Sequence, residues 1–397
     1  MKKYITPTVI IVSLVSFFTD IASEMLYPIM PGYLQSIGYG VVAIGLLEGV
    51  AEAFAGISKV FFAHVSDVTG KRKIFLLFGY GISALAKPLI GFTSSIATIF
   101  SAKLADRIGK GVRTAPRDAL LIAESVPEDR GKVFGFHRSI DTLGAVVGPL
   151  LGLLLLVVYK NNVTSIFYFA IIPGILAVVT LLFLPKEKIS VSKPATKERK
   201  SLRTLISFWK KSPREYKKLF IGFVLFSCIN STNMFLLVRV ADLGFSSYTV
   251  IAVYLVFNLA YAFFSFPLGV RADRYGFKYV YLLGIVSFAI TYGLLGTTYV
   301  KSHTVLILLF IIYGVFGAVE DGIGKAWLSL TIDKEYKATG IGLYLLFNSL
   351  ALLLASLGTA FLWKNVGGGV ALSIIALLSV VVGIYFYFIP NTIQKQL

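Results

Sequence analysis

The sequence has few of the residues that soluble and secreted proteins need. Its 397 residues include one cysteine and three histidines, and 15% of them are charged, against about 25% in a typical soluble domain. The single cysteine, Cys228, excludes a disulfide-stapled secreted module. The low charge excludes a soluble enzyme of this length, because such a chain would lack the polar side chains that cover a water-facing surface.

Apolar residues dominate the composition. Hydrophobic residues make up 56% of the chain, and the mean hydropathy is +0.80. Lys and Arg number 38 against 20 Asp and Glu, a formal net charge of +18, but most of the basic residues fall in alternate connections between apolar segments. This positive-inside pattern sets orientation in a membrane and gives no reason to expect a nucleic-acid partner. We therefore expect a multi-pass protein of the plasma (inner) membrane with both termini in the cytoplasm.

The apolar segments are long enough to span a bilayer. A spanning helix needs about 20 mostly apolar residues, and turn residues divide the chain into twelve such segments. They cover residues 8–34, 41–62, 74–94, 96–124, 133–158, 165–184, 219–240, 248–270, 279–299, 304–332, 338–362 and 368–390. The predicted fold is all-α, with a six-helix bundle at 1–184, a basic cytoplasmic linker at 185–218 and a second six-helix bundle at 219–397.

The two halves of the chain contain an internal repeat. A shift of 206 residues places Gly38 on Gly244 and Asp67 on Asp273. An even number of spans in each half gives both halves the same orientation in the membrane, which is the arrangement of parallel repeats. We therefore expect two pseudo-symmetric bundles.

Two loop segments at the repeat offset carry a motif. Residues 63–73 and 269–278 are similar to Gly-x-x-x-Asp-Arg-x-Gly-Arg-Arg, the loop motif of the major facilitator superfamily, although Val68 replaces its first arginine. The residues that fit and that the resemblance assigns to gating are Asp67, Gly70, Arg72, Asp273 and Arg274. The resemblance covers essentially the whole chain and implies a secondary transporter that works by alternating access.

The fifth predicted span adds a second point of resemblance. Gly144, Gly148 and Pro149 are similar to the glycine-proline motif of the proton-coupled drug antiporters in that superfamily, and we expect them to act in gating as well. Glycines let helices approach closely and proline removes a backbone hydrogen bond, so the motif marks a place where helices bend and slide. Arg107 followed by Gly111 resembles the Arg-x-x-x-Gly motif that is implicated in proton transfer.

Charged residues inside the spans are functional candidates, because each costs several kcal/mol in lipid unless it faces protein or water. The predicted proton-coupling residues are Asp20, Glu24, Glu48, Glu52, Asp106, Arg107 and Asp141. Proton coupling needs a carboxylate whose charge changes as a neighbouring cation moves. Our first candidate is Glu24 with Arg107, with Asp20 or Asp141 as the alternative acid, and His137 is a candidate relay because it precedes Asp141 by one turn.

A second set of polar residues suits substrate binding. Uncharged polar side chains are concentrated in the second half, where they can hydrogen-bond a substrate at little cost in desolvation. The predicted substrate contacts are Tyr27, Lys103, Asn230, Asn233, Arg239, Tyr254, Asn258 and Asn348.

The sequence therefore predicts a proton-coupled exporter of a small organic substrate, working as a monomer without cofactor or metal. Three alternatives remain open. Asp20, Glu24, Glu48 and Glu52 could instead serve a metal-cation exporter, the basic face of the fourth span could bind an organic anion, or the chain could be a non-transporting sensor. An enzyme is not expected, because the sequence has no His-Glu-x-x-His, no Gly-x-Ser-x-Gly and no P-loop.

Overall fold

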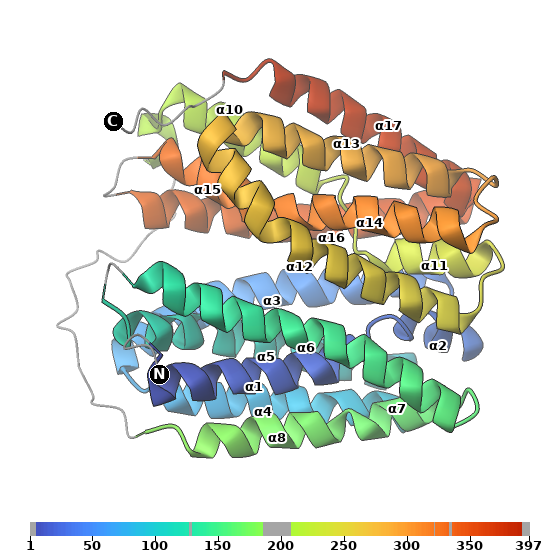
Figure 1. The fold of residues 1–397 in the computed structure, drawn as a ribbon, viewed down its shortest axis with the longest axis horizontal. Helices are drawn as coiled ribbons and strands as arrows, with labels where there is room; N and C mark the ends of the chain where they lie inside the picture. The colour runs from blue at the N-terminus through green and yellow to red at the C-terminus, as the bar shows by residue number, and fades with distance from the viewer. Residues whose placement is uncertain (1–4, 127–128, 186–207, 321, 333–335, 391–397) are drawn as a thin grey trace. The chain divides into compact units, whose positions relative to one another are not determined.

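The computed structural model describes residues 5–126, 129–185, 208–320, 322–332 and 336–390, and only the backbone of residues 64, 67, 131, 337 and 338. All the labelled elements in this part are α-helices (Figure 1). The helices of the first half are α1 (Pro7–Glu24), α2 (Met30–Ser36), α3 (Val41–Thr69), α4 (Arg72–Gly91), α5 (Ile96–Ala123), α6 (Arg130–Val158), α7 (Val163–Phe169) and α8 (Ile171–Leu182). Those of the second half are α10 (Arg214–Ser227), α11 (Met234–Asp242), α12 (Ser247–Tyr275), α13 (Phe277–Gly296), α14 (His303–Glu320), α15 (Ile323–Leu330), α16 (Lys337–Val366) and α17 (Gly368–Tyr387).

The chain divides into two compact units. Unit 1 consists of residues 1–39 and 50–196, and unit 2 of residues 40–49 and 197–397. The first residues of α3 therefore group with unit 2, although the sequence places them in the first half. Most of the predicted linker, residues 186–207, lies outside the described residues, and α10 begins at Arg214, four residues before the predicted end of the linker. The division into domains at 184 and 219 stays a prediction.

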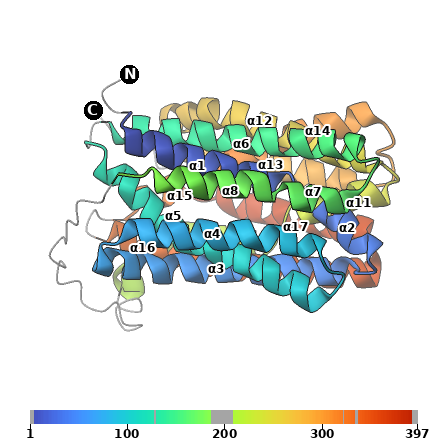
Figure 2. The same cartoon turned by 90° about the horizontal axis from the view of Figure 1, so that it is seen from below.

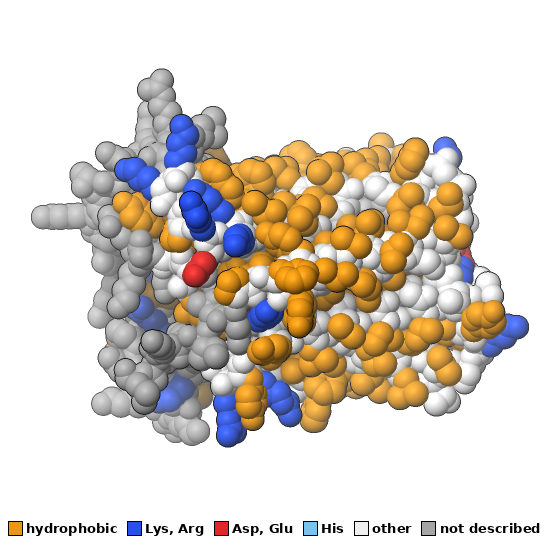
Figure 3. Space-filling model, turned by 90° about the horizontal axis from the view of Figure 1, so that it is seen from above, with side chains coloured by type: hydrophobic (Ala, Val, Ile, Leu, Met, Phe, Trp, Pro, Cys, Tyr) orange, Lys and Arg blue, Asp and Glu red, His pale blue; other side chains and the backbone are white. Residues whose placement is uncertain are grey.

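In the described part of the chain, ten segments are helical, long and apolar enough to cross a membrane. Two of the twelve predicted spans are not among them, and each has a physical reason. Helix α5 carries more charged residues than an apolar span tolerates, and the seventh span is divided between the short helices α10 and α11. The face in Figure 3 is covered mainly by hydrophobic side chains, and most of its Lys and Arg side chains gather toward one end, which suits a lipid-facing surface.

Among the described residues, three of the predicted spans are divided between two helices. Residues 8–34 form α1 and α2, and residues 165–184 form α7 and α8. A proline ring clashes with the carbonyl group four residues earlier, and α1 ends four residues before Pro28, just as α7 ends four residues before Pro173. The seventh span is interrupted between Ser227 and Met234, in a stretch that contains several polar residues.

The internal repeat is confirmed by backbone conformation. Helices α3 and α12 each have 29 residues and start at positions that differ by the repeat offset. The turns before them place Gly38 at φ +91° and Gly244 at φ +90°, and the turns after them place Gly70 at φ +66° and Gly276 at φ +97°. These left-handed conformations favour glycine. The same glycine-dependent turns therefore flank the same long helix in both halves.

Within unit 1, α1 packs along α6 and against α8, while α4 packs along α5 (Figures 1 and 2). A buried apolar cluster that includes Val9 of α1, Tyr80 of α4 and Leu121 of α5 lies next to these contacts. Asp20 lies at the α1–α6 contact, and Lys87 and Asp106 join α4 to α5.

Candidate functional site

Helix α6 presents a stripe of glycines to α1. Gly144, Gly148 and Gly152 are spaced one turn apart, so they share one face of the helix. A Cβ atom placed on Gly144 would lie 2.6 Å from the carbonyl oxygen of Phe17, and one on Gly148 would lie 2.9 Å from that of Ile21. Any larger residue would force the two helices apart, so the glycines allow contact between backbones.

This close contact brings the acidic face of α1 against α6. A Cβ atom on Gly144 would lie 3.0 Å from the Cβ atom of Asp20, and one on Gly148 would lie 3.0 Å from that of Glu24. Asp141 lies one turn before Gly144 on the same face of α6. The charged groups that act most strongly on Asp20 are Asp141, Glu24, Lys110 and Arg113. Three carboxyl groups of the predicted proton-coupling set are thus brought together.

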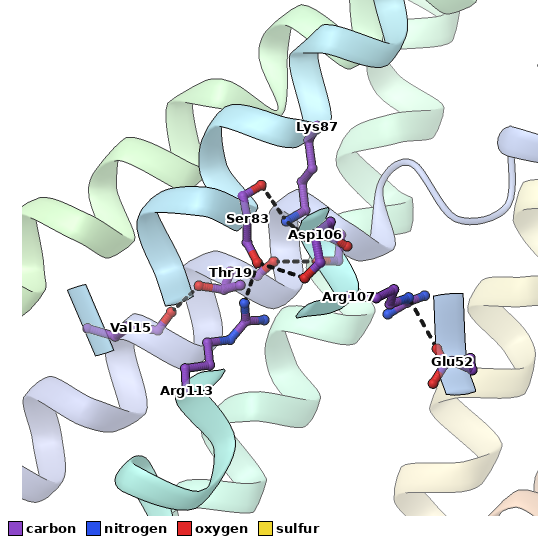
Figure 4. Close-up of polar contacts among 9 residues, drawn as sticks. Val15, Thr19, Glu52, Ser83, Lys87, Asp106, Arg107 and Arg113 are labelled. Atoms are coloured by element: carbon purple, nitrogen blue, oxygen red, sulfur yellow. Dashed lines mark hydrogen bonds and ion pairs between the residues drawn. The ribbon is translucent and has the colours of Figure 1, made fainter. Parts of the chain in front are cut away.

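Helices α4 and α5 are joined by a buried ion pair. Lys87 Nζ lies 2.8 Å from Asp106 Oδ1, and the exposed fractions of the two side chains are 5% and 13%. Arg113 Nη1 donates to Ser83 Oγ at 2.5 Å, and Ser83 Oγ in turn donates to the carbonyl oxygen of Asp106 at 3.1 Å. Figure 4 shows these four side chains gathered in one cluster.

Arg107 points away from this cluster and toward α3 (Figure 4). Its Nε atom lies 3.1 Å from Glu52 Oε1, so the structure pairs two residues of the predicted proton-coupling set. The pairing of Arg107 with Glu24 stays a prediction. Glu48, one turn before Glu52 in α3, is buried, with 1% of its surface exposed.

A polar chain crosses the contact of α1, α4 and α5. Arg117 pairs with Asp118 at 2.9 Å and donates to Ser16 Oγ at 3.3 Å. Ser16 Oγ lies 3.3 Å from the hydroxyl oxygen of Tyr80. The guanidinium carbon of Arg113 lies 4.6 Å from the centre of the Tyr80 ring, a cation–π distance. The basic face of α5 is therefore joined to α1 and α4 by specific contacts.

The two predicted substrate contacts of unit 1 lie together. Lys103 in α5 is buried, and its Nζ atom lies 5.9 Å from the centre of the Tyr27 ring. Tyr27 belongs to the turn between α1 and α2. The ammonium group and the ring are thus within range of a cation–π interaction.

In unit 2, predicted substrate contacts lie at two helix breaks. Asn230 is in the break between α10 and α11, and its side-chain amide donates to Glu320 Oε1 at the end of α14. Asn233 is the N-cap residue before α11 and accepts a hydrogen bond from the Tyr313 hydroxyl at 2.7 Å. Broken helices in transporters commonly supply polar groups to a binding site at the middle of the bilayer.

Three further predicted contacts are held inside unit 2. Asn348 of α16 accepts a hydrogen bond from Ser227 Oγ at 2.5 Å. Tyr254 and Asn258 lie one turn apart on α12, and both are buried. These three side chains belong to two helices of the same unit, and their role in binding stays a prediction.

Arg239 makes contacts that the sequence did not predict. Its Nε atom donates to the carbonyl oxygen of Leu295 at 2.8 Å, and its Nη2 atom donates to that of Thr297 at 3.0 Å. These carbonyl groups end α13, where a cation is stabilised by the helix dipole. The guanidinium group therefore caps a helix.

The gating residues predicted from the two loop motifs lie at helix ends, whereas Gly144, Gly148 and Pro149 lie inside α6. The side chain of Asp67 is outside the described part of the chain. Gly70 forms the left-handed turn after α3, and Arg72 donates to a backbone carbonyl oxygen near the end of α5 at 3.0 Å. Asp273 and Arg274 are exposed in the last turn of α12.

Several side chains of these clusters were not predicted as site residues, among them Lys87, Arg113 and Glu320. Lys87 is a lone cation in an apolar span, which signals that an acidic partner is needed. That signal does not identify Asp106, which comes 19 residues later on another helix. Among the described residues, no group of three or more His, Cys, Asp or Glu side chains is placed to hold a metal ion.

Comparison with known proteins gives a family match over most of the chain. The profile of the Major Facilitator Superfamily matches residues 12–257 and, in a second match, residues 219–396. The uncharacterized MFS-type transporter MJ1317 of Methanocaldococcus jannaschii is 36% identical over 370 residues, which cover 91% of this chain and 90% of that protein. The multidrug resistance protein MdtG of Serratia proteamaculans is 28% identical over 186 residues, 45% of this chain and 44% of that protein.

Solved structures show the same fold. A D-xylose-proton symporter superposes with a TM-score of 0.78 at 16% identity, covering 99% of this chain and 100% of that one. The nucleoside transporter NupG superposes with a TM-score of 0.77 at 15% identity, covering 98% of each chain. Identities this low show the fold alone. The fold is that of the superfamily, with twelve transmembrane helices in two pseudo-symmetric bundles.

Proposed function

The chain belongs to the Major Facilitator Superfamily, and we propose that this secondary transporter exports a small organic substrate in exchange for protons. Its family and its relatives are those of a multi-pass membrane transporter and not of an enzyme. Proton coupling, the direction of transport and the class of substrate are the proposed part.

The observation that carries the proposal is the convergence of Asp20, Glu24 and Asp141 at the α1–α6 contact. Carboxyl groups that share a site repel one another when all are ionised, so one of them favours the protonated form. The nearby cations Lys110 and Arg113 act in the opposite sense on Asp20. If the distance between these cations and the carboxyl groups changes, one of the carboxyl groups would bind or release a proton.

The α1–α6 contact also gives such a change a mechanical route. The motif glycines place α1 directly against the backbone of α6, and Pro149 lies within that helix. Because glycine has no side chain, α1 and α6 can shift slightly against each other and keep their close contact. The partial similarity to a multidrug resistance protein supports export of an organic compound. We place the chain in the plasma membrane as a monomer with both termini in the cytoplasm.

The metal-export alternative has less support. Hard cations are held by several converging oxygen ligands, and the described residues contain no group of acids and histidines so arranged. Four basic side chains of α5 are engaged with an acid, a hydroxyl or a ring, as Arg107 is with Glu52 and Arg117 with Asp118. That engagement makes an organic anion a weaker candidate.

The test uses purified full-length protein in proteoliposomes. A thermal-shift screen of organic cations, neutral compounds, organic anions and divalent metals first selects a substrate, because a ligand that binds the folded state raises apparent stability. A pH gradient is then imposed. We expect the wild type to move the selected organic compound uphill, and Asp20→Asn to equilibrate it without accumulation.

Asp129→Asn is the matched control, because the half-buried Asp129 precedes the first residue of α6, away from the α1–α6 carboxyl groups, and forms an ion pair with the exposed Lys132 at 2.7 Å. This variant should accumulate substrate as the wild type does. Uphill transport that needs no pH gradient, or stabilisation by divalent metals alone, would overturn the proposal.

A further inference from the structure

His137 extends the α1-facing stripe of α6 by one turn beyond Asp141. Its side chain is 4% exposed and its Nδ1 atom lies 3.3 Å from Ser13 Oγ of α1. Helices α1 and α6 run in the same direction, since Ser13 faces His137 and Asp20 faces Gly144. Ionisable side chains therefore follow one another along this contact in the order His137, Asp141, Asp20 and Glu24.

The hydrogen bonds of Ser13 define the tautomer of the ring. A serine hydroxyl has one proton to donate, and Ser13 Oγ donates it to the carbonyl oxygen of Val9 at 2.7 Å. Toward His137 the same oxygen therefore acts as an acceptor. The neutral imidazole must carry its proton on Nδ1, which leaves Nε2 as an unprotonated acceptor.

Nε2 of His137 is buried and has no hydrogen-bond partner among the described residues. Buried acceptors without a partner are rare in proteins, and each calls for an explanation. The charged groups that act on this ring come from α5 and α6 and are Arg117, Asp141, Asp118 and Arg138. Helix α1 contributes the uncharged Ser13. The charges of the two carboxyl groups thus oppose those of the two guanidinium groups around the Nε2 atom.

We propose that His137 relays protons between Asp141 and the solvent at the end of unit 1 where α6 begins. This inference rests on the proposed function and names the path by which protons reach that site. In the step, the O–H bond of the Asp141 carboxyl group breaks and an N–H bond forms at Nε2. The imidazolium then releases that proton from Nε2 to water. Nδ1 keeps its proton, and its bond to Ser13, throughout the cycle.

The tautomer is tested on the wild-type protein without any substrate. Nitrogen NMR of histidine-labelled full-length protein resolves protonated from unprotonated ring nitrogens, and loss of one signal set in His137→Asn assigns that residue. We expect a protonated Nδ1 and an unprotonated Nε2 at neutral pH. Ser13→Ala should allow the other tautomer to appear. A ring that carries its proton on Nε2 in the wild type would overturn the proposal.

The relay is tested by the rate of proton uptake after a rapid drop in pH, followed with a pH indicator in detergent solution. His137→Asn keeps a donor near Nδ1 and so retains the bond to Ser13, but it has no Nε2. His137→Gln places an amide near Nε2 that cannot take up a proton. We expect both variants to take up protons at the buried carboxyl groups at least tenfold more slowly than the wild type.

The matched controls are His303→Asn and His303→Gln, because His303 is exposed at the start of α14. These should leave the uptake rate unchanged. A wild-type rate in His137→Asn would show that the ring only supports the fold and would overturn the relay, even if pH-driven transport by the wild type is normal. Absence of pH-driven transport in the wild type would instead overturn the proposed function, and the relay with it.

Discussion

At the scale of single residues, the charged side chains of unit 1 are stabilised by specific partners. Lys87 and Asp106 form a nearly fully buried pair, and Arg107 meets Glu52 on a third helix. An uncompensated charge in a low-dielectric interior is strongly unfavourable, whereas a complete pair is close to neutral in its net contribution. The Lys87–Asp106 pair therefore serves chiefly to fix α4 against α5 in one arrangement.

The pair predicts an asymmetry between single and double variants. Lys87→Met leaves the Asp106 carboxylate buried without its closest cation, so the free energy of unfolding should fall by about 3–5 kcal/mol. Adding Asp106→Asn to Lys87→Met should recover most of that loss. Unfolding in mixed detergent micelles measures both.

Lys132→Met is the control for that experiment, because Lys132 also pairs with an aspartate but is 59% exposed. An exposed pair contributes about 0–1 kcal/mol, so this variant should be nearly neutral. Equal losses in Lys87→Met and Lys132→Met would contradict the assignment of a buried structural pair.

The sequence identified most of the ionisable residues of the site but not their partners. Asp20, Glu24 and Asp141 could be chosen because acids are costly inside apolar spans. Arg107 could not be assigned to Glu52, and Lys87 could not be assigned to Asp106, because each pair joins two helices whose relative rotation no local pattern specifies. Partner choice depends on tertiary packing, which a single sequence does not encode in its spacing.

At the scale of helices, the glycine stripe of α6 sets the distance to α1. Gly144 is in backbone contact with α1, whereas a Cβ atom on Gly135, in the same helix, would meet no atom within 4 Å. The two glycines therefore differ in what an added methyl group would encounter.

Gly144→Ala should lower the free energy of unfolding by roughly 1–3 kcal/mol, because the added methyl group must displace the Phe17 carbonyl or push the helices apart. Gly135→Ala should raise it by up to about 1 kcal/mol, since alanine is the better helix former. Unfolding titrations of the two variants show whether each one lowers or raises the free energy of unfolding. A stabilising Gly144→Ala would show that α1 and α6 are not in tight contact.

Helix breaks show where sequence analysis of elements reaches its limit. The apolar lengths of the spans were sufficient to predict membrane crossing, but not continuity. Pro28 and Pro173 contained the information for two breaks, since α1 and α7 each end four residues before a proline. The break at Cys228–Asn233 lacks proline or glycine, and the polar side chains there form contacts such as Asn230 with Glu320 only in the folded unit.

At the scale of the whole molecule, the two halves share a six-helix arrangement but carry different polar side chains. The flanking glycines of α3 and α12 adopt positive φ angles in both halves. The first half carries the carboxyl cluster and its cations. In the second half the described polar contacts are made by asparagines and tyrosines, and Asn230 donates to the Glu320 carboxylate. Duplication therefore preserves backbone geometry while the polar side chains diverge, which separates proton binding from substrate binding in the proposed mechanism.

The central claim is that the carboxyl cluster at the α1–α6 contact holds a proton that is exchanged for substrate. The most direct measurement is proton release when the compound selected by the thermal-shift screen binds to the purified protein in weakly buffered detergent solution. The wild type should release protons in proportion to the compound bound, and Asp20→Asn should bind the compound with little or no release. Binding by the wild type without proton release, or undiminished release by Asp20→Asn, would contradict the account.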